Sequence, residues 1–223
     1  MLEQMSDQPL VQHEPSPETT SSPPRKLKCE QILQGALTVF LEHGYAGTSM
    51  DRVAAVAGVS KQTIYSHFQD KQGLFTALIE RMMIDRFRVE FGSEPLQGEP
   101  AMLLRRLAET FLTKMGDAEF IAFFRLVIAE SARFPELAQL YTRTVMQYGY
   151  VNLSQYFESH PELHIADPEA MSRIFFGSLG AFILVQEVMH GKQIMAMSEE
   201  RLIDSLIATV LSQATVGQVG KSH

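Results

Sequence analysis

The chain contains a single cysteine, Cys29. One cysteine excludes a disulfide within the chain, so a reducing cytoplasm is the expected location. The first 24 residues have neither a basic start nor an apolar run, and therefore do not resemble a secretory signal. The longest apolar stretch, IFFGSLGAFILV at 174–185, is too short to span a bilayer, and we expect no membrane partner.

Motifs that mark enzymes are also missing from the sequence. It has no Gly-rich phosphate loop and no His-Glu zinc motif, and FGSLG at 176–180 lacks the spacing of a nucleophile elbow. His160 and His164 are four residues apart, but SHPELHIADP reads as a loop, in which a metal pair is not expected. We therefore predict no enzyme activity, no cofactor and no metal site.

Basic residues are few and unevenly placed. The net charge is −7, of which residues 1–24 contribute −4 and the region after residue 75 contributes −5, whereas residues 25–75 carry +2. An acidic chain with one slightly basic segment suits a protein that touches nucleic acid through one small face.

Helical periodicity runs through almost the whole chain. Residues 1–24 are rich in Pro, Ser, Thr and Glu and predict a disordered acidic tail. After them, apolar residues recur at spacings of three and four, and Gly, Pro, Ser and Asp mark the helix ends. No strand pattern is present. We expect an all-α fold of about nine helices, at 26–44, 50–57, 61–68, 71–91, 101–114, 118–133, 135–159, 168–190 and 199–212.

The expected domains are a head at 25–75, a body at 76–215 and a flexible tail at 216–223. Within the head, two short helices on either side of Gly58 have the layout of a helix-turn-helix. Val53, Ala54 and Ile64 face inward, and a polar, weakly basic face of the second helix is left outside. Such a face can reach base edges and phosphates in a DNA groove.

Residues 43–78, HGYAGTSMDRVAAVAGVSKQTIYSHFQDKQGLFTAL, resemble the DNA-binding head of the TetR family of transcriptional regulators. The stretch FFRLVIAESARFPELAQLY at 123–141 is similar to the body of the AefR-like subgroup. The resemblance implies a homodimer that binds a double-stranded operator.

The same resemblance assigns roles to the head residues. Lys61 and Gln62 fall where the family reads bases. Phosphate contacts are implied for Thr63, Tyr65, His67 and Lys71, and for Thr48 or Ser49 at the start of the helix before. Gln62 stands where glycine is common in the family, and a glutamine can contact adenine with two hydrogen bonds. His67 could instead be a structural residue.

Methionine and phenylalanine are frequent in the body, and methionine adapts to irregular apolar shapes. Met82, Met115 and Phe123 are candidates to line a pocket for a small apolar ligand, with Arg125 as a polar anchor. The alternative is that these apolar residues are plain core and that Arg125 forms a surface ion pair.

Small residues mark the helix at 168–190, where Gly177, Gly180 and Ala181 would let another helix approach closely. Leu206 and Ile207 belong to an apolar stripe on the last helix. By resemblance these two helices form the dimer interface, and a bundle within one chain is the alternative.

Together these features predict a DNA-binding repressor that a small apolar effector releases from a pseudo-palindromic operator. The alternative is a ligand-independent regulator, or an activator, whose body serves only for dimerisation.

Overall fold

The computed structural model describes residues 24–92 and 94–219, and this part of the chain contains helices and no strands. The helices form nine continuous rods, which confirms the predicted all-α class. The α-helical segments within these rods are α1 (Pro24–Gly47), α2 (Met50–Ala57), α3 (Lys61–Phe68), α4 (Lys71–Ile79), α5 (Asp85–Phe91), α6 (Pro100–Met115), α7 (Ala118–Glu130), α8 (Pro135–Tyr141), α9 (Gln147–Glu158), α10 (Pro168–Ile183) and α11 (Glu199–Val219). Two short 3₁₀ turns, η3 (Pro161–Leu163) and η5 (Gly191–Gln193), complete the set.

Three of the rods contain a π-helical turn. η1 (Glu80–Ile84) joins α4 to α5, η2 (Thr142–Met146) joins α8 to α9, and η4 (Leu184–Val188) extends α10. A π-turn inserts one residue into the helical repeat and rotates the face that follows, and such turns are frequent at functional sites. The predicted helices 71–91 and 135–159 are thus continuous, but neither is a regular α-helix throughout.

The tail predicted at 1–24 lies outside the described residues except for Pro24, which begins α1. The C-terminal tail was predicted to begin at 216, yet α11 continues to Val219. No proline interrupts the sequence between 199 and 219, and a single helical glycine costs only about 1 kcal/mol, so the longer helix is physically reasonable.

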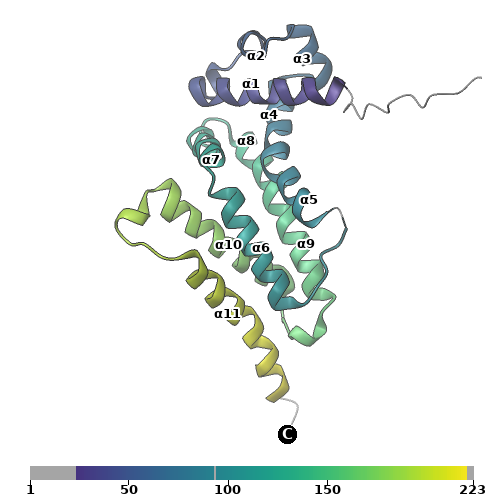
Figure 1. The fold of residues 1–223 in the computed structure, drawn as a ribbon, viewed down its shortest axis with the longest axis vertical. Coiled ribbons are helices and arrows are strands. Elements are labelled where there is room, and N and C mark those ends of the chain that lie inside the picture. The colour runs from purple at the N-terminus through teal and green to yellow at the C-terminus, as the bar shows by residue number, and fades with distance from the viewer. Residues whose placement is uncertain (1–23, 93, 220–223) are drawn as a thin grey trace, which may run out of the picture.

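The head forms one end of the molecule, with α2 and α3 lying across α1 (Figure 1). Ser49 caps α2 by accepting the amide of Arg52, and Ser60 caps α3 by accepting the amide of Thr63. Gly58 lies between the two helices at φ 64°, ψ 34°, a left-handed conformation that glycine adopts without strain. The turn between the helices is therefore the one that the sequence predicted.

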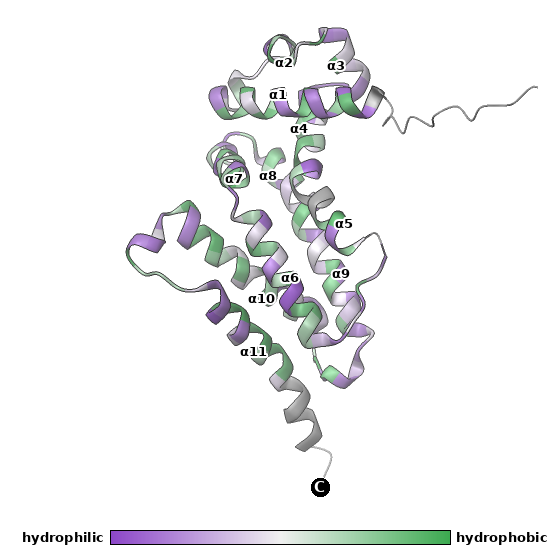
Figure 2. Cartoon of the chain, viewed as in Figure 1, coloured by the Kyte–Doolittle hydropathy of each residue, from purple (hydrophilic) through white to green (hydrophobic). Residues whose placement is uncertain are grey.

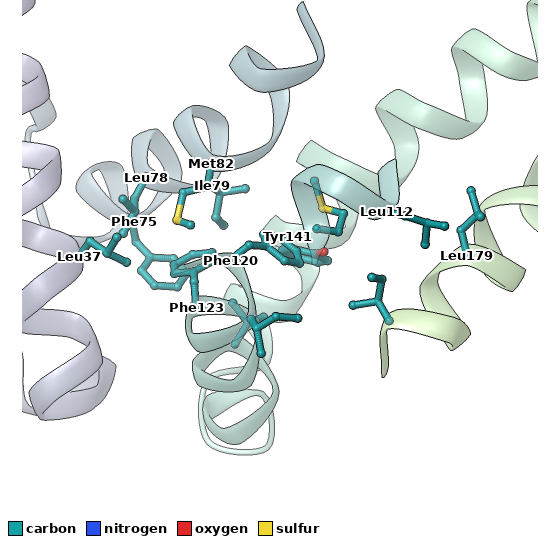
Figure 3. Packing of buried hydrophobic residues seen from close by; sticks show 14 of the residues in the cluster. Leu37, Phe75, Leu78, Ile79, Met82, Leu112, Phe120, Phe123, Tyr141 and Leu179 are labelled. Carbon is teal, nitrogen blue, oxygen red and sulfur yellow. The ribbon is translucent and has the colours of Figure 1, made fainter. Parts of the chain in front are cut away.

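One rod, α4–η1–α5, leaves the head and enters the body (Figure 1). At its upper end the side chains of Phe75 and Leu78 are fully buried against Leu37 of α1 and Phe123 of α7 (Figure 3). The rings of Phe75 and Phe123 are 5.3 Å apart. Head and body consequently share one continuous apolar core.

A kink near the end of α1 is held by the body. Gly44 has φ 68° and ψ 175°, a combination that is essentially restricted to glycine. The next residue, Tyr45, donates its amide to Oε1 of Glu130 at 2.9 Å, and Glu130 is the last residue of α7. Nζ of Lys71 donates to the Tyr45 carbonyl at 2.8 Å and lies 4.5 Å from the Tyr45 ring centre. These contacts join α1, α4 and α7 immediately before the helix-turn-helix.

In the body, α10 packs against α6 and α9, and α11 packs against α6, α10 and η3. Figure 2 shows apolar and polar residues alternating along these helices, as amphipathic packing requires. Among the described residues, the helix Pro168–Val188 is the one that is long and apolar enough, by length and composition, to cross a membrane. It extends beyond the apolar run at 174–185 on both sides. This helix packs against α6, α9 and α11, and part of its apolar surface remains exposed.

Candidate DNA interface and effector cavity

The second helix of the helix-turn-helix, α3, presents a polar face to solvent. Its two buried side chains are Ile64 and Phe68, which lie four residues apart and anchor the helix to the head. Lys61, Gln62 and Tyr65 are exposed, whereas Thr63 and His67 are half-buried. The structure therefore brings the five predicted α3 residues to the outward side of one short helix.

The side chains on this face differ in whether they have a partner within the protein. Nζ of Lys61 lies 2.8 Å from Oδ2 of Asp51 in α2, and this ion pair raises the pKa of the ammonium. The hydroxyl of Thr63 is 2.8 Å from that of Ser60. Gln62 has no side-chain hydrogen bond to the rest of the described chain, and its amide is free to meet a base edge. The sequence pattern did not predict Asp51 as the partner of Lys61.

The three flanking candidates occupy different surroundings. Thr48 is buried, and its hydroxyl donates to the Gly44 carbonyl at 2.7 Å, so this side chain is used inside the head. Ser49 is exposed, and its oxygen caps α2 while its hydroxyl hydrogen remains available. Lys71 donates to the carbonyls of Tyr45 and Thr48, at 2.8 and 3.2 Å. Partial burial lowers the pKa of Lys71, with Glu130 opposing that shift. Of the three side chains, Ser49 is the best placed for phosphate.

A cavity of about 380 Å³ lies inside the body. Apolar side chains from six helices, α5 to α10, and from η2 and η4 surround it, and aromatic rings dominate. The phenylalanines that line it are Phe87, Phe91, Phe111, Phe120, Phe124 and Phe176, and the tyrosines are Tyr141, Tyr148 and Tyr150. Its volume and lining are those of a small-molecule site. All three π-turns lie beside it: η1 ends just before α5, η2 contributes Val145 and Met146, and η4 contributes Leu184.

Among the four predicted ligand residues, Met115 lines the cavity. Met82 and Phe123 are 1% and 0% exposed and lie outside the lining, in the core that joins head and body. Arg125 is exposed, and its guanidinium donates to the carbonyls of Glu187 and Val188 at the end of η4. For these three residues the structure favours the alternative of plain core or surface contact. Aromatic pairs four residues apart, such as Phe87 with Phe91, were the signal for the true lining.

The predicted dimer residues divide into two groups. Gly177, Gly180 and Ala181 lie on the exposed or half-exposed side of α10 and also line the cavity. Leu206 and Ile207 are 6% and 8% exposed and already pack inside their own chain. The α10 residues are accessible to a second chain. The two α11 residues are already buried within one chain, so their burial does not require a dimer.

No cluster of three or more His, Cys, Asp or Glu side chains that could hold a metal occurs in the described ranges. His160 in particular is occupied by its own helix, because Nδ1 lies 2.8 Å from the Tyr156 carbonyl.

Comparison with known proteins agrees with this arrangement. The profile described as "Bacterial regulatory proteins, tetR family" matches residues 32–78, which span the helix-turn-helix and α4. A second profile, "AefR-like transcriptional repressor, C-terminal domain", matches residues 102–213, half of the chain. The chain belongs to the TetR family. Its body is of the AefR-like type, as the sequence resemblance indicated.

Individual relatives share mainly the head. The HTH-type transcriptional repressor SCO4008 of Streptomyces coelicolor is 40% identical over 55 residues, 25% of this chain and 29% of that protein. The HTH-type transcriptional regulator YerO of Bacillus subtilis is 25% identical over 188 residues, 79% of this chain and 64% of that protein. In both cases the match covers less than two thirds of the relative.

Among solved structures, the flavonoid-responsive regulator FrrA is similar over almost its whole length. It superposes with a TM-score of 0.65 and 27% identity, covering 86% of this chain and 97% of FrrA. The two-part architecture of head and body is therefore a shared fold and not only a shared motif.

Proposed function

We propose that this TetR-family protein is a sequence-specific repressor whose body binds a small aromatic or apolar effector, and that effector binding releases it from its operator. The polar face of α3 supplies the DNA contacts, with Gln62 and Lys61 at base edges and Ser49, Thr63, Tyr65 and His67 at phosphates. FrrA, which responds to flavonoids by its description, supports an effector-responsive body.

The observation that carries the proposal is the continuity of one rod between the two sites. Phe87 and Phe91 of α5 line the cavity, and Phe75 of α4 is buried in the head core. An effector that repositions α5 must move α4 or strain η1 between them. Because α4 packs on α1 and α3, that movement changes the position of the recognition helix.

A second connection runs through α7. Phe120 and Phe124 line the cavity from one side of this helix, while Phe123 packs on Phe75 and Glu130 accepts the Tyr45 amide. Effector and operator binding are therefore proposed to be coupled by about 1–3 kcal/mol, a change of some 5–150-fold that applies equally to both ligands.

We propose further that the protein acts as a cytoplasmic homodimer joined through α10 and α11. Ile174 of α10 is 52% exposed and Leu184 of η4 is 36% exposed, on the same side of the rod as Gly177 and Ala181. Such a dimer would bind two half-sites about one helical turn of DNA, roughly 34–36 Å, apart.

The test is selection of bound genomic fragments followed by footprinting at two salt concentrations. A pseudo-palindromic footprint whose affinity falls steeply with salt is the expected result. A protein that enriches no sequence, or protects one asymmetric half-site, would contradict the proposal. If an operator is found and no cavity ligand alters its affinity, the ligand-independent regulator becomes the better description.

A further inference from the structure

The charge of the cavity lining restricts which effector can enter. Among the described residues that line it, none is Lys, Arg or His, and the one charged side chain is the carboxylate of Glu94, which is exposed to solvent. An anion placed among the phenylalanines would find no counter-charge and would lose its hydration. Aromatic faces, in contrast, carry partial negative charge and tolerate neutral or cationic guests.

One polar side chain in the lining, that of Tyr141, has no hydrogen-bond partner among the described residues. Tyr141 is 8% exposed, its ring lies 5.6 Å from that of Phe124, and both side chains line the cavity. Its hydroxyl makes no hydrogen bond to any residue that the structure describes. In Figure 3 the Tyr141 oxygen points away from Phe75 and the head. Because Tyr141 lines the cavity and its hydroxyl has no partner among the described residues, a ligand group that pairs with this hydroxyl would stabilise the complex.

The hydroxyl of Tyr141 is a donor at any physiological pH. Burial raises the pKa of this phenol, and the nearby Tyr150 adds to the shift. The neutral phenol can therefore donate its proton to an acceptor on a ligand, such as a carbonyl oxygen.

We infer that the effector is an uncharged or cationic, planar aromatic molecule that presents a carbonyl-type acceptor to Tyr141, and that anionic acyl compounds are excluded. The inference rests on the proposed function, since it specifies the ligand class of the same cavity. The rings of Phe111 and Phe176, 5.7 Å apart and tilted by 47°, form part of the apolar wall against which such a molecule would lie.

A neighbouring hollow offers the competing arrangement. Its lining includes Arg143, Arg173 and Glu169, and it shares Met146 and Tyr150 with the cavity. Arg173 is already paired with Glu169 at 2.7 Å and lies 5.1 Å from the Tyr150 ring. Arg143 belongs to this second hollow and is not part of the cavity lining. Anion binding through Arg143 is the outcome that would replace our inference.

Three anthracene derivatives of matched shape separate these possibilities. 2-Acetylanthracene is neutral with an acceptor, anthracene-2-carboxylate is anionic, and 2-ethylanthracene has no acceptor. Binding to the full chain without DNA is followed by anthracene fluorescence. The acetyl compound should bind tightest and the carboxylate at least about tenfold more weakly, because its charge is desolvated without a partner.

Two conservative variants locate the acceptor contact. Tyr141→Phe should weaken the acetyl compound about two- to tenfold and leave 2-ethylanthracene unchanged, because only the hydrogen bond is lost. Removal of an unpartnered hydroxyl is not expected to destabilise the fold. The matched control is Tyr156→Phe, whose hydroxyl donates to the Gly98 carbonyl at 2.8 Å and which is not part of the cavity lining. This control should bind all three compounds as the wild type does.

The inference is overturned if the carboxylate binds tightest, above all if Arg143→Gln then weakens it. Equal binding of the acetyl compound to wild type and Tyr141→Phe would also contradict it. Operator binding is measured separately on ligand-free protein. Failure of the ligand-free protein to bind any operator would refute the proposed function. The order of the three ligand affinities tests only the inference about the cavity.

Discussion

Replacement of Gly44 by alanine tests the contact between the body and the base of the DNA-binding head. The backbone of Gly44, at φ 68° and ψ 175°, lies in a region where other residues cost about 1–3 kcal/mol. A Cβ at this position would also lie 2.5 Å from Oε1 of Glu130. The carboxylate would have to withdraw and would release the Tyr45 amide, a charged hydrogen bond worth about 1.5–3 kcal/mol.

Gly44→Ala should therefore lower the free energy of unfolding by about 2.5–6 kcal/mol, measured by urea denaturation followed by circular dichroism. In a Glu130→Ala background there is no carboxylate to displace. The same substitution should then cost only the backbone part, about 1–3 kcal/mol, which makes the two positions energetically coupled.

Gly47→Ala is the matched control, because Gly47 ends the same helix without positive φ and its Cβ would meet only the Cβ of His43, at 3.3 Å. It should stay near wild-type stability. The described contact between Glu130 and the Tyr45 amide would be refuted by either of two results. One is a Gly44→Ala variant with wild-type stability; the other is an equal loss of unfolding free energy with and without Glu130.

Three further predictions follow from individual side chains. Gln62→Ala should relax base preference at one or two operator positions and cost about 1–3 kcal/mol on the cognate site, and an unchanged motif in sequence selection would rule out this residue as a base reader. Gly177→Leu should give monomers in sedimentation, and a wild-type chain that is monomeric at micromolar concentration would refute the dimer itself. Burial raises the pKa of Tyr156 to about 12, with Glu99 and Glu162 contributing, so its stabilising effect should be complete below about pH 10 and decline as the pH rises towards 12. Tyr45 and Tyr141 also have raised pKa values, so urea denaturation at several pH values should show a smaller alkaline decline for Tyr156→Phe than for the wild type. An identical decline in both proteins would contradict the assignment.

Local signals in the sequence were sufficient for several helix starts and for the exposed side of α3. Ser and Asp residues were expected to mark helix ends, and Ser49, Ser60 and Asp167 each accept a backbone amide at the start of a helix. A cap acts within four residues along the chain, so its effect is visible in the sequence. The same holds for α3, where Ile64 and Phe68 are inside because helical periodicity decides which side faces out.

The π-turns could not be predicted in the same way. The segments at 80–84, 142–146 and 184–188 have the same apolar periodicity as the α-helices around them. The extra residue in each turn depends on how the rod packs against its neighbours, and no local residue preference signals it.

The partner of each side chain was likewise decided by tertiary structure. Met82 and Met115 are both apolar and both on helices of the body, yet one is sealed in the core and the other lines a cavity. Leu206 was predicted to belong to a dimer interface, and it is buried within its own chain, on a helix that packs against α6, α10 and η3. Periodicity specifies that a face is buried, because the hydrophobic effect has no direction, but which surface covers it depends on the shapes of all the helices together.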